Sequence, residues 1–190
     1  MDGLNLSPGG QAWAPWGLSI AYDLSEELFT SSNTTPASTA WPAANQAMYF
    51  PFYIQAPGYI QQMVWVNGAT ATGNVAMGLY DEAFNLLAGT GSVSATGTSA
   101  PQAVSMPAPA QGPAGVLVTC GRYFLALWAS SGSQTFIAWT TAAASTNVNR
   151  MLGIGQQTSL TTGLPTLAVP AVSANSYIPL IGVSYSALTV

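Results

Sequence analysis

Few side chains in this sequence can carry acid–base or nucleophilic chemistry. The 190 residues include no histidine and no lysine, two arginines and six acidic residues. The absence of histidine excludes Ser-His-Asp and Cys-His catalytic groups and any histidine metal ligand. The serine and threonine hydroxyls therefore have neither a histidine nor a lysine to act as their base. We expect a protein that is not an enzyme, with no catalytic residue, no cofactor and no bound metal ion.

The remaining candidates for catalysis are carboxylates. Asp81 and Glu82 are adjacent, so on a strand their side chains would point to opposite faces. A glycosidase needs two carboxylates that converge on one bond, and Asp23 with Glu26 or Glu27 is the other source of such a group. Nothing in the sequence brings the two groups together, and a polar turn and a helix cap account for them. A glycosidase that uses carboxylates alone is therefore the last of three functional hypotheses.

The composition excludes further classes of partner and predicts a folded chain. Charged residues make up 4% of the sequence, and the net charge is −4. Two arginines cannot neutralise a row of phosphates, so we expect no nucleic-acid partner and no basic membrane patch. The apolar content of 49% is ample for a core. The longest apolar stretch, residues 114–129, is interrupted by Gly115, Gly121 and Arg122, and it predicts two buried strands rather than a membrane span.

From residue 46 onward the pattern is that of short strands. Val75, Met77 and Leu79 alternate with small residues and are predicted to face a core. Seven to nine such segments, separated by turn signals and without a long amphipathic helix, predict an all-β fold, a jelly-roll-like antiparallel β-sandwich. The other strands are expected within residues 48–54, 59–66, 84–87, 102–106, 116–119, 123–128, 134–140 and 177–185, whereas residues 141–176 are interpreted as loop.

Three local details can be checked against a structure. Ile60, Val64 and Val66 are predicted to share the inner face of their strand. Asn67-Gly68 directly after them is typical of a tight turn. Cys120, the single cysteine, cannot form an internal disulfide, and its apolar neighbours predict a buried free thiol.

The first 45 residues differ from the rest. They contain four prolines and three of the six tryptophans. Asp23-Leu24-Ser25-Glu26 resembles a capping box and predicts one short helical turn. The prolines otherwise favour an extended path that leaves the aromatic rings without partners along it. We therefore divide the chain into an extended N-terminal arm, residues 1–45, and a β-sandwich domain, residues 46–190. The candidate attachment or subunit contacts are Trp13, Trp16, Leu28, Phe29 and Trp41, and we expect the arm to make its main contacts outside its own sandwich. The alternative is that the arm folds back and completes its own sandwich as an edge strand.

Several segments together resemble a known family. They are Ser38-Thr39-Ala40-Trp41-Pro42-Ala43-Ala44-Asn45, Pro51-Phe52, Trp65-Val66-Asn67-Gly68-Ala69-Thr70, Gly73-Asn74-Val75-Ala76-Met77-Gly78-Leu79-Tyr80-Asp81, Gly97-Thr98-Ser99, Gly121-Arg122-Tyr123-Phe124-Leu125-Ala126 and Tyr177-Ile178-Pro179-Leu180. In this order they resemble tailed-bacteriophage virion proteins described as minor structural, tail or head-fibre proteins. The resemblance covers residues 38–185 and consists of strand and turn signatures. It therefore implies a place in a particle rather than a reaction, and for a jelly roll on a virion it implies a homotrimer.

Two further hypotheses about function follow. The leading one is a non-enzymatic structural component of a bacteriophage particle, a head decoration, head fibre or tail protein, which attaches to capsid or tail proteins through its arm. Met1-Asp2-Gly3 does not begin a secretory signal, so we expect synthesis in the cytoplasm. The resemblance implies that this is the cytoplasm of a host and that the final place of the protein is the virion. The alternative is a receptor-binding module in which exposed aromatic rings stack on a host surface glycan. For Trp65, Trp128 and Trp139, which lie on predicted strands, core packing is the favoured interpretation. No membrane insertion is expected.

Overall fold

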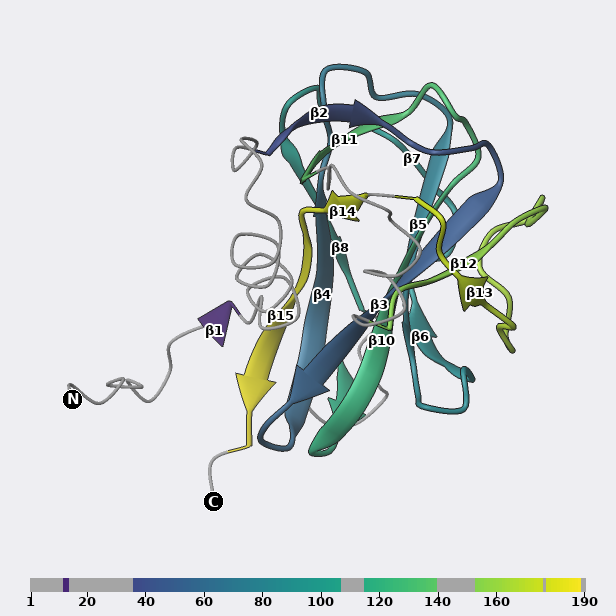
Figure 1. Ribbon diagram of the computed structural model, residues 1–190. Helices are drawn as coiled ribbons and strands as arrows, with labels where there is room; N and C mark the ends of the chain where they lie inside the picture. Colours follow the sequence, from purple (N-terminus) through teal and green to yellow (C-terminus); the bar gives the residue numbers. More distant parts are fainter. Residues whose placement is uncertain (1–11, 14–35, 107–114, 140–152, 176, 189–190) are drawn as a thin grey trace, which may run out of the picture.

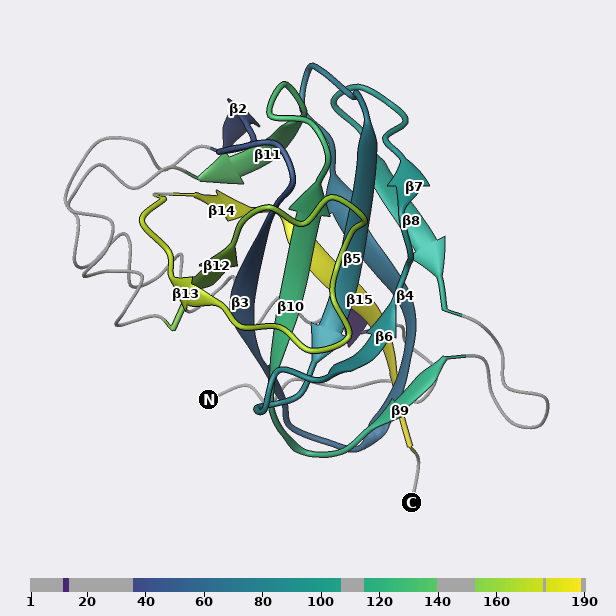
Figure 2. The same cartoon turned by 90° about the vertical axis from the view of Figure 1, so that its right-hand side faces the viewer.

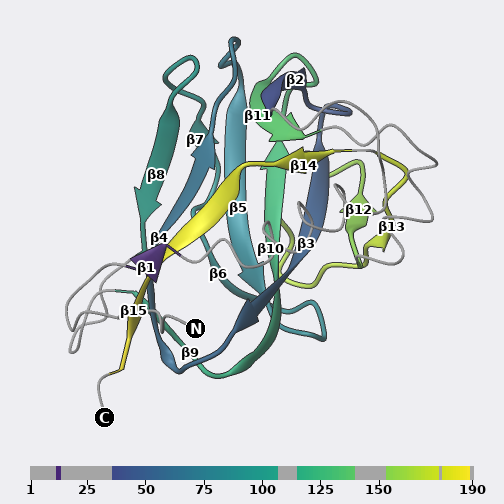
Figure 3. The same cartoon turned by 60° about the vertical axis from the view of Figure 1, so that its left-hand side comes forward.

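The computed structural model describes residues 12–13, 36–106, 115–139, 153–175 and 177–188, and these residues form an antiparallel β-sandwich (Figure 1). The first sheet has the order β1 (Ala12–Trp13), β15 (Ile181–Ala187), β4 (Gly58–Val66) and β8 (Pro101–Ser105), and β9 (Val116–Val118) also pairs with β4. The second has the order β13 (Ala171–Val172), β12 (Gly155–Gln157), β3 (Gln46–Ile54), β10 (Gly121–Ala129), β5 (Asn74–Tyr80) and β6 (Leu86–Gly89), and β7 (Val93–Ser94) also pairs with β5. The third sheet lies at one end (Figure 3), and its order is β14 (Ile178–Pro179), β11 (Thr135–Trp139) and β2 (Ala37–Ala40).

The predicted fold class is confirmed. Strands that are neighbours in sequence cross between sheets, since β3 and β5 lie in the second sheet and β4 between them lies in the first. All pairings between the described strands are antiparallel. This exchange of the chain between two facing sheets is the jelly-roll-like arrangement that the strand pattern predicts.

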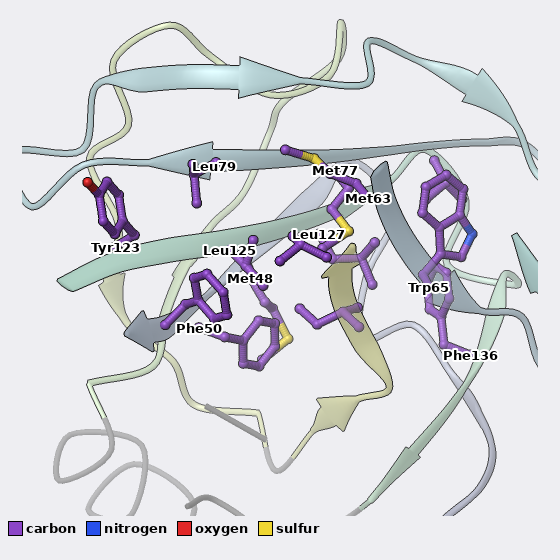
Figure 4. Close-up of a cluster of buried hydrophobic side chains, with 14 of the residues drawn as sticks. Met48, Phe50, Met63, Trp65, Met77, Leu79, Tyr123, Leu125, Leu127 and Phe136 are labelled. Carbon is purple, nitrogen blue, oxygen red and sulfur yellow. The ribbon is translucent and has the colours of Figure 1, made fainter. Parts of the chain in front are cut away.

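The core between the two large sheets follows the predicted alternation. Val75, Met77 and Leu79 are fully buried on the inner face of β5. The register places Leu127 of β10 directly between Met77 of β5 and Met48 of β3, so that these side chains form one row across the second sheet (Figure 4). The first sheet contributes Ile60, Met63, Trp65, Ile181 and Val183 to the same cluster. Ile181 and Val183 of β15 therefore face the core.

The prediction for β4 is wrong in part. Ile60 faces the core, but Met63 and Trp65 are its other fully buried residues, and Val64 and Val66 lie on the outer face. The pairing with β15 explains the change, because Ser184 lies opposite Gln62 while Tyr185 lies opposite Ile60. The one extra residue on β4 is a β-bulge, which reverses the inward and outward positions along the strand.

The boundary between arm and sandwich lies earlier than predicted. Strand β2 pairs along its whole length with β11, and the turn after it leads directly into β3. Asn45 adopts a positive φ of 56° in this turn, and its N–H donates to the carbonyl of Ala129 at 2.9 Å. Residues 37–45 are therefore part of the sandwich, and the arm is confined to the residues before them. The predicted helical turn at residues 23–29 lies outside the described residues.

Part of the stretch interpreted as loop has a structural role. Residues 158–170, which we call the strap, connect β12 to β13 and cross the outer face of the second sheet (Figure 2). Leu160 and Leu164 of the strap pack against a second buried cluster, which includes Tyr49, Tyr80 and Trp128. Both faces of the second sheet are therefore covered, which the alternation in β5 alone did not predict.

Candidate assembly interface

The five residues predicted to make attachments have different outcomes. Trp16, Leu28 and Phe29 lie outside the described residues, and Trp13 is in strand β1. Trp41 is a correction to the prediction, because only 2% of its surface is exposed. It cannot contact another subunit without unfolding the end of the sandwich.

The contacts of Trp41 explain its burial. Its ring meets Phe136 and Tyr177 edge-on, at centroid distances of 5.2 and 5.3 Å. Its Nε1–H donates to the carbonyl of Gln46 at 3.0 Å, so the polar end of the indole is satisfied inside the core. Trp41 is thus a core residue rather than a contact for a partner, although it precedes Pro42 in the segment assigned to the arm.

Strand β1 is the described part of the arm, and it pairs with β15 of the same chain, as the alternative of an arm folded back as an edge strand predicts. Ala12 lies opposite Tyr185 and Trp13 lies opposite Ser184, in antiparallel register. Strand β15 has β4 on its other side, so β1 covers what is otherwise the edge of the first sheet. An uncovered sheet edge presents unpaired N–H and C=O groups that bind other strands. This edge is the candidate assembly interface.

The acceptor strand has two distinctive side chains at the point of contact. Ser184 is 3% exposed, and its hydroxyl has no hydrogen-bond partner. Tyr185 is half-buried, packs against the main core cluster, and donates its hydroxyl hydrogen to the carbonyl of Ala56. Burial raises the pKa of the Tyr185 phenol above its ordinary value, with a smaller contribution from Cys120. Tyr185 therefore fixes β15 to the connection between β3 and β4, beside the place where β1 pairs.

Exposed apolar side chains mark a second surface. Val169 and Leu167 of the strap are 76% and 58% exposed. Leu167 lies opposite Asn85, two residues before the exposed Leu87 of β6, and Val172 of β13 is also exposed. Exposed apolar side chains that lie close together are typical of surfaces that another molecule covers. Sequence reasoning missed them, although the repeated leucines and valines in a stretch rich in Gly and Thr were a signal.

The acidic pair forms a turn. The carboxylate of Asp81 accepts hydrogen bonds from the backbone N–H of Asn85 at 2.8 Å and from its side-chain amide at 2.9 Å. These bonds lower the pKa of Asp81 below its usual value of 3.8. Within the described residues no group of three or more His, Cys, Asp or Glu side chains comes together. The geometry of Asp81 is that of a turn stabilised by its own side chain.

The basic side chain of Arg122 lies against an aromatic ring. Its guanidinium carbon is 4.8 Å from the centroid of Phe124, and the buried Nε has no hydrogen-bond partner. A Cβ added at Gly153 would lie 2.7 Å from the guanidinium, and the φ of +73° at this glycine also disfavours a side chain. The charge is therefore held in a cation–π contact under the backbone at residue 153.

Asn67 is a buried polar centre that the sequence did not predict. Its side-chain oxygen accepts from Trp65 Nε1 at 3.2 Å and from Gln134 Nε2 at 3.0 Å, while its amide nitrogen donates to the Gln102 side chain and to the carbonyl of Thr96. Asn67 also forms a β-bridge with Phe136. Asn67 thus connects the segments that contain Thr96, Gln102 and Gln134, and the Asn-Gly pair does not close a hairpin. Every polar atom of the Asn67 side chain is bonded, so this cluster is structural.

The cysteine and the strand tryptophans differ in their exposure. Cys120 is exposed, contrary to the prediction of a buried thiol, and its thiol donates to the carbonyl of Gln55 at 3.2 Å. Trp65 and Trp128 are buried, as predicted, and Trp139 is half-buried. Tyr53 is the aromatic residue among the large exposed side chains of the described part.

Comparison with known proteins leaves the site to be interpreted from its own geometry. No protein-family model matches the chain, and no curated protein or solved structure is similar to it at a significant level. Within the described ranges there is no helix with the length and apolarity needed to cross a membrane.

Proposed function

We propose that the protein is a non-enzymatic structural subunit of a tailed-bacteriophage particle, attached to neighbouring virion proteins through its N-terminal arm. The observation that carries the proposal is that Ala12–Trp13 pairs with the edge strand β15, here of its own chain, so this segment of the arm can add to a sheet edge by main-chain contacts. The buried clusters described for the sandwich are formed by residues 41–183. The arm is then an appendage that binds sheet edges by main-chain pairing, which is a common mode of attachment between proteins.

The distribution of charge supports a separate role for the arm. Residues 1–35 contain Asp2, Asp23, Glu26 and Glu27 and no basic residue, so they carry the whole net charge of −4. Residues 36–190 contain two acids and two arginines and have no net charge. An acidic arm is attracted to basic surfaces, whereas its own sandwich has no net charge to attract or repel it. The attachment, unlike the fold, is then expected to weaken with salt.

The sequence resemblance to phage virion proteins supplies the identity of the particle in this proposal. A head decoration, head fibre or tail position is compatible with an all-β subunit that has an exposed apolar surface at Leu167 and Val169. The receptor-binding alternative has less support, since Trp41, Trp65 and Trp128 are buried and the exposed aromatic side chain in the described part is Tyr53.

A truncation tests the attachment. The structure places the boundary before β2, so the variant to compare with the full chain is residues 36–190, not 46–190. Particles assembled without this protein are mixed with either form and sedimented. We expect the full chain to pellet with the particles, more weakly at about 0.5 M than at about 0.05 M salt, and the truncated chain to stay in solution.

Two controls complete the test. The truncated chain must keep the circular-dichroism spectrum and the urea midpoint of a folded sandwich, as the buried clusters of residues 41–183 predict. Sedimentation of the truncated chain at the level of the full chain would overturn the attachment role of the arm. A glycan array with both forms tests the alternative, because binding that survives truncation would place recognition on the sandwich.

A further inference from the structure

The edge at β15 has the properties of a strand-acceptor site. Strand β15 is paired along β4 from Ile181 to Ala187, and on its other side the described residues that pair with it are those of β1, opposite Ser184 and Tyr185. The inner face of β15 is already filled by Ile181 and Val183 in the core. What the structure describes of β1 is thus its main-chain pairing at this edge.

Main-chain pairing does not depend on which copy of the chain supplies the strand. Residues 14–36 separate β1 from β2, and 23 residues can span at most about 83 Å. The sandwich of about 150 residues has a radius of gyration of about 15 Å. The connection is thus long enough to place β1 on a neighbouring subunit. Figures 1 and 3 show that β1 and β2 lie well apart on the sandwich, β1 beside β15 and β2 at the end formed with β11.

A pairing of two residues contributes little stability by itself, whichever copy supplies the strand. In a ring, each copy gives one arm and receives one, so that every arm is held by the closed assembly as well as by its own contacts. This closure favours an exchanged arm.

We propose that β15 is the acceptor for the Ala12–Trp13 segment of a second copy, so that the subunits of the assembled protein exchange their arms. This inference rests on the proposed structural role, and it names the partner of the arm within the particle as another copy of the same chain. The exchange is head-to-tail and closes into a small ring, of which a homotrimer is one form.

Disulfide trapping tests the exchange. In a Cys120→Ser background, one chain carries Ala12→Cys and a second, separately tagged chain carries Tyr185→Cys, and the two are produced together and oxidised. Residues directly opposite in antiparallel strands have Cα atoms about 4.5–5.5 Å apart, which suits a disulfide. We expect a covalent heterodimer on a non-reducing gel. The Trp13→Cys and Ser184→Cys pair repeats the test with the neighbouring position in case Tyr185→Cys disturbs the fold.

The controls define the results that overturn the exchange. Ala12→Cys combined with Val169→Cys, an exposed position on the strap, should give no heterodimer. A single chain with both Ala12→Cys and Tyr185→Cys should give covalent oligomers. If it gives only an internally cross-linked monomer, or if neither pair forms a disulfide, the exchange is wrong. Sedimentation with particles is measured separately. If residues 36–190 alone fail to attach while the doubly substituted full chain forms only an internal cross-link, the exchange is rejected and the attachment role of the arm stands.

Discussion

The two faces of the second sheet are both buried, but they are buried by different means. On the inner face the rows consist of long aliphatic side chains, such as Met48, Leu127 and Met77, and face another sheet. On the outer face large and small residues alternate, so that Trp128 lies between Ala47 and Ala76. The inner face packs against the first sheet, whereas the small residues of the outer face leave room for the irregular strap.

The second buried cluster, on the outer face, which we call the outer cluster, holds the strap through the polar groups of its aromatic side chains. The hydroxyl of Tyr80 donates to the carbonyl of Pro165 at 2.6 Å, and the indole N–H of Trp128 donates to the carbonyl of Leu160 at 2.8 Å. The hydroxyl of Tyr49 donates to the side chain of Gln157 at 3.2 Å. Burial raises the pKa of Tyr49 and Tyr80 far above the usual range, so both phenols stay protonated and act as donors. A segment with few sheet partners is thus fixed by side chains that satisfy its carbonyls.

The largest expected effect is the loss of a side chain from the inner face. Met77→Ala leaves a cavity between β5 and β10, where Met77 is fully buried, and should lower the free energy of unfolding by about 2–5 kcal/mol. Urea denaturation measures the change. Val169→Ala, on the exposed side of the strap, is the control and should leave the midpoint unchanged. A loss near zero for Met77→Ala would mean that the register of β5 is wrong.

An added side chain on the outer face should have the next largest effect. A Cβ at Gly78 would lie 2.9 Å from the terminal carbons of both Leu164 and Leu86, so Gly78→Val overfills the cluster under the strap and should cost about 1–3 kcal/mol. The matched control is Gly182→Val on β15, where a Cβ meets nothing within 4 Å. Equal losses in the two variants would show that strand glycines, rather than the closeness of the strap, determine the cost.

Removal of one hydroxyl should loosen the strap and leave the core intact. Tyr80→Phe deletes the bond to the Pro165 carbonyl and should cost about 0.5–1.5 kcal/mol. Hydrogen exchange should show faster exchange at the amides of Leu86 and Ala168, which bond across the strap, with little change in β10. Tyr53→Phe, at an exposed position, is the control. Uniformly faster exchange throughout the sandwich would show that the strap and the core open as one unit.

The comparison also shows what the sequence can and cannot reveal. Period-two alternation identified Val75, Met77 and Leu79 because each faces a regular sheet. The same alternation did not reveal that the outer face is buried. Ala76 and Gly78 on that face are small because the strap lies close to them, and not because the face is exposed to water. The strap itself has no period, so its burial is decided by tertiary contacts alone.

The candidate interface was accessible to sequence reasoning only in part. The arm was recognised from its prolines and tryptophans, but Trp41 was assigned to it because Phe136 and Tyr177, which enclose the ring, are far away in sequence. The pairing of β1 with β15 could not be predicted, because a strand of two residues has no pattern and main-chain pairing requires no particular side chain. Edge positions become visible only when the sheet order is known.

The smallest effect concerns the turn that carries Phe84 into the outer cluster. The Asp81 carboxylate bonds to Asn85 and closes this turn, in which Phe84 has a φ of 62° and stacks on Phe124 at 4.4 Å. The pKa of Asp81 is lowered by these bonds, so the stability they contribute is present above the usual pKa of about 4 and is lost as pH falls through the folded value.

Melting temperatures at neutral pH and at about pH 3 should therefore differ slightly more in the natural protein than in Asp81→Asn, which has no carboxylate to protonate. Because the turn serves the outer cluster, we expect hydrogen exchange at low pH to rise around Phe84 and Ala168 before it rises at Met77. Glu82→Gln removes the neighbouring carboxyl without touching the bonds to Asn85 and should keep the pH difference of the natural protein. If Asp81→Asn keeps that difference as well, acid acts through groups outside this turn, and the two faces of the sheet are equally insensitive to its protonation.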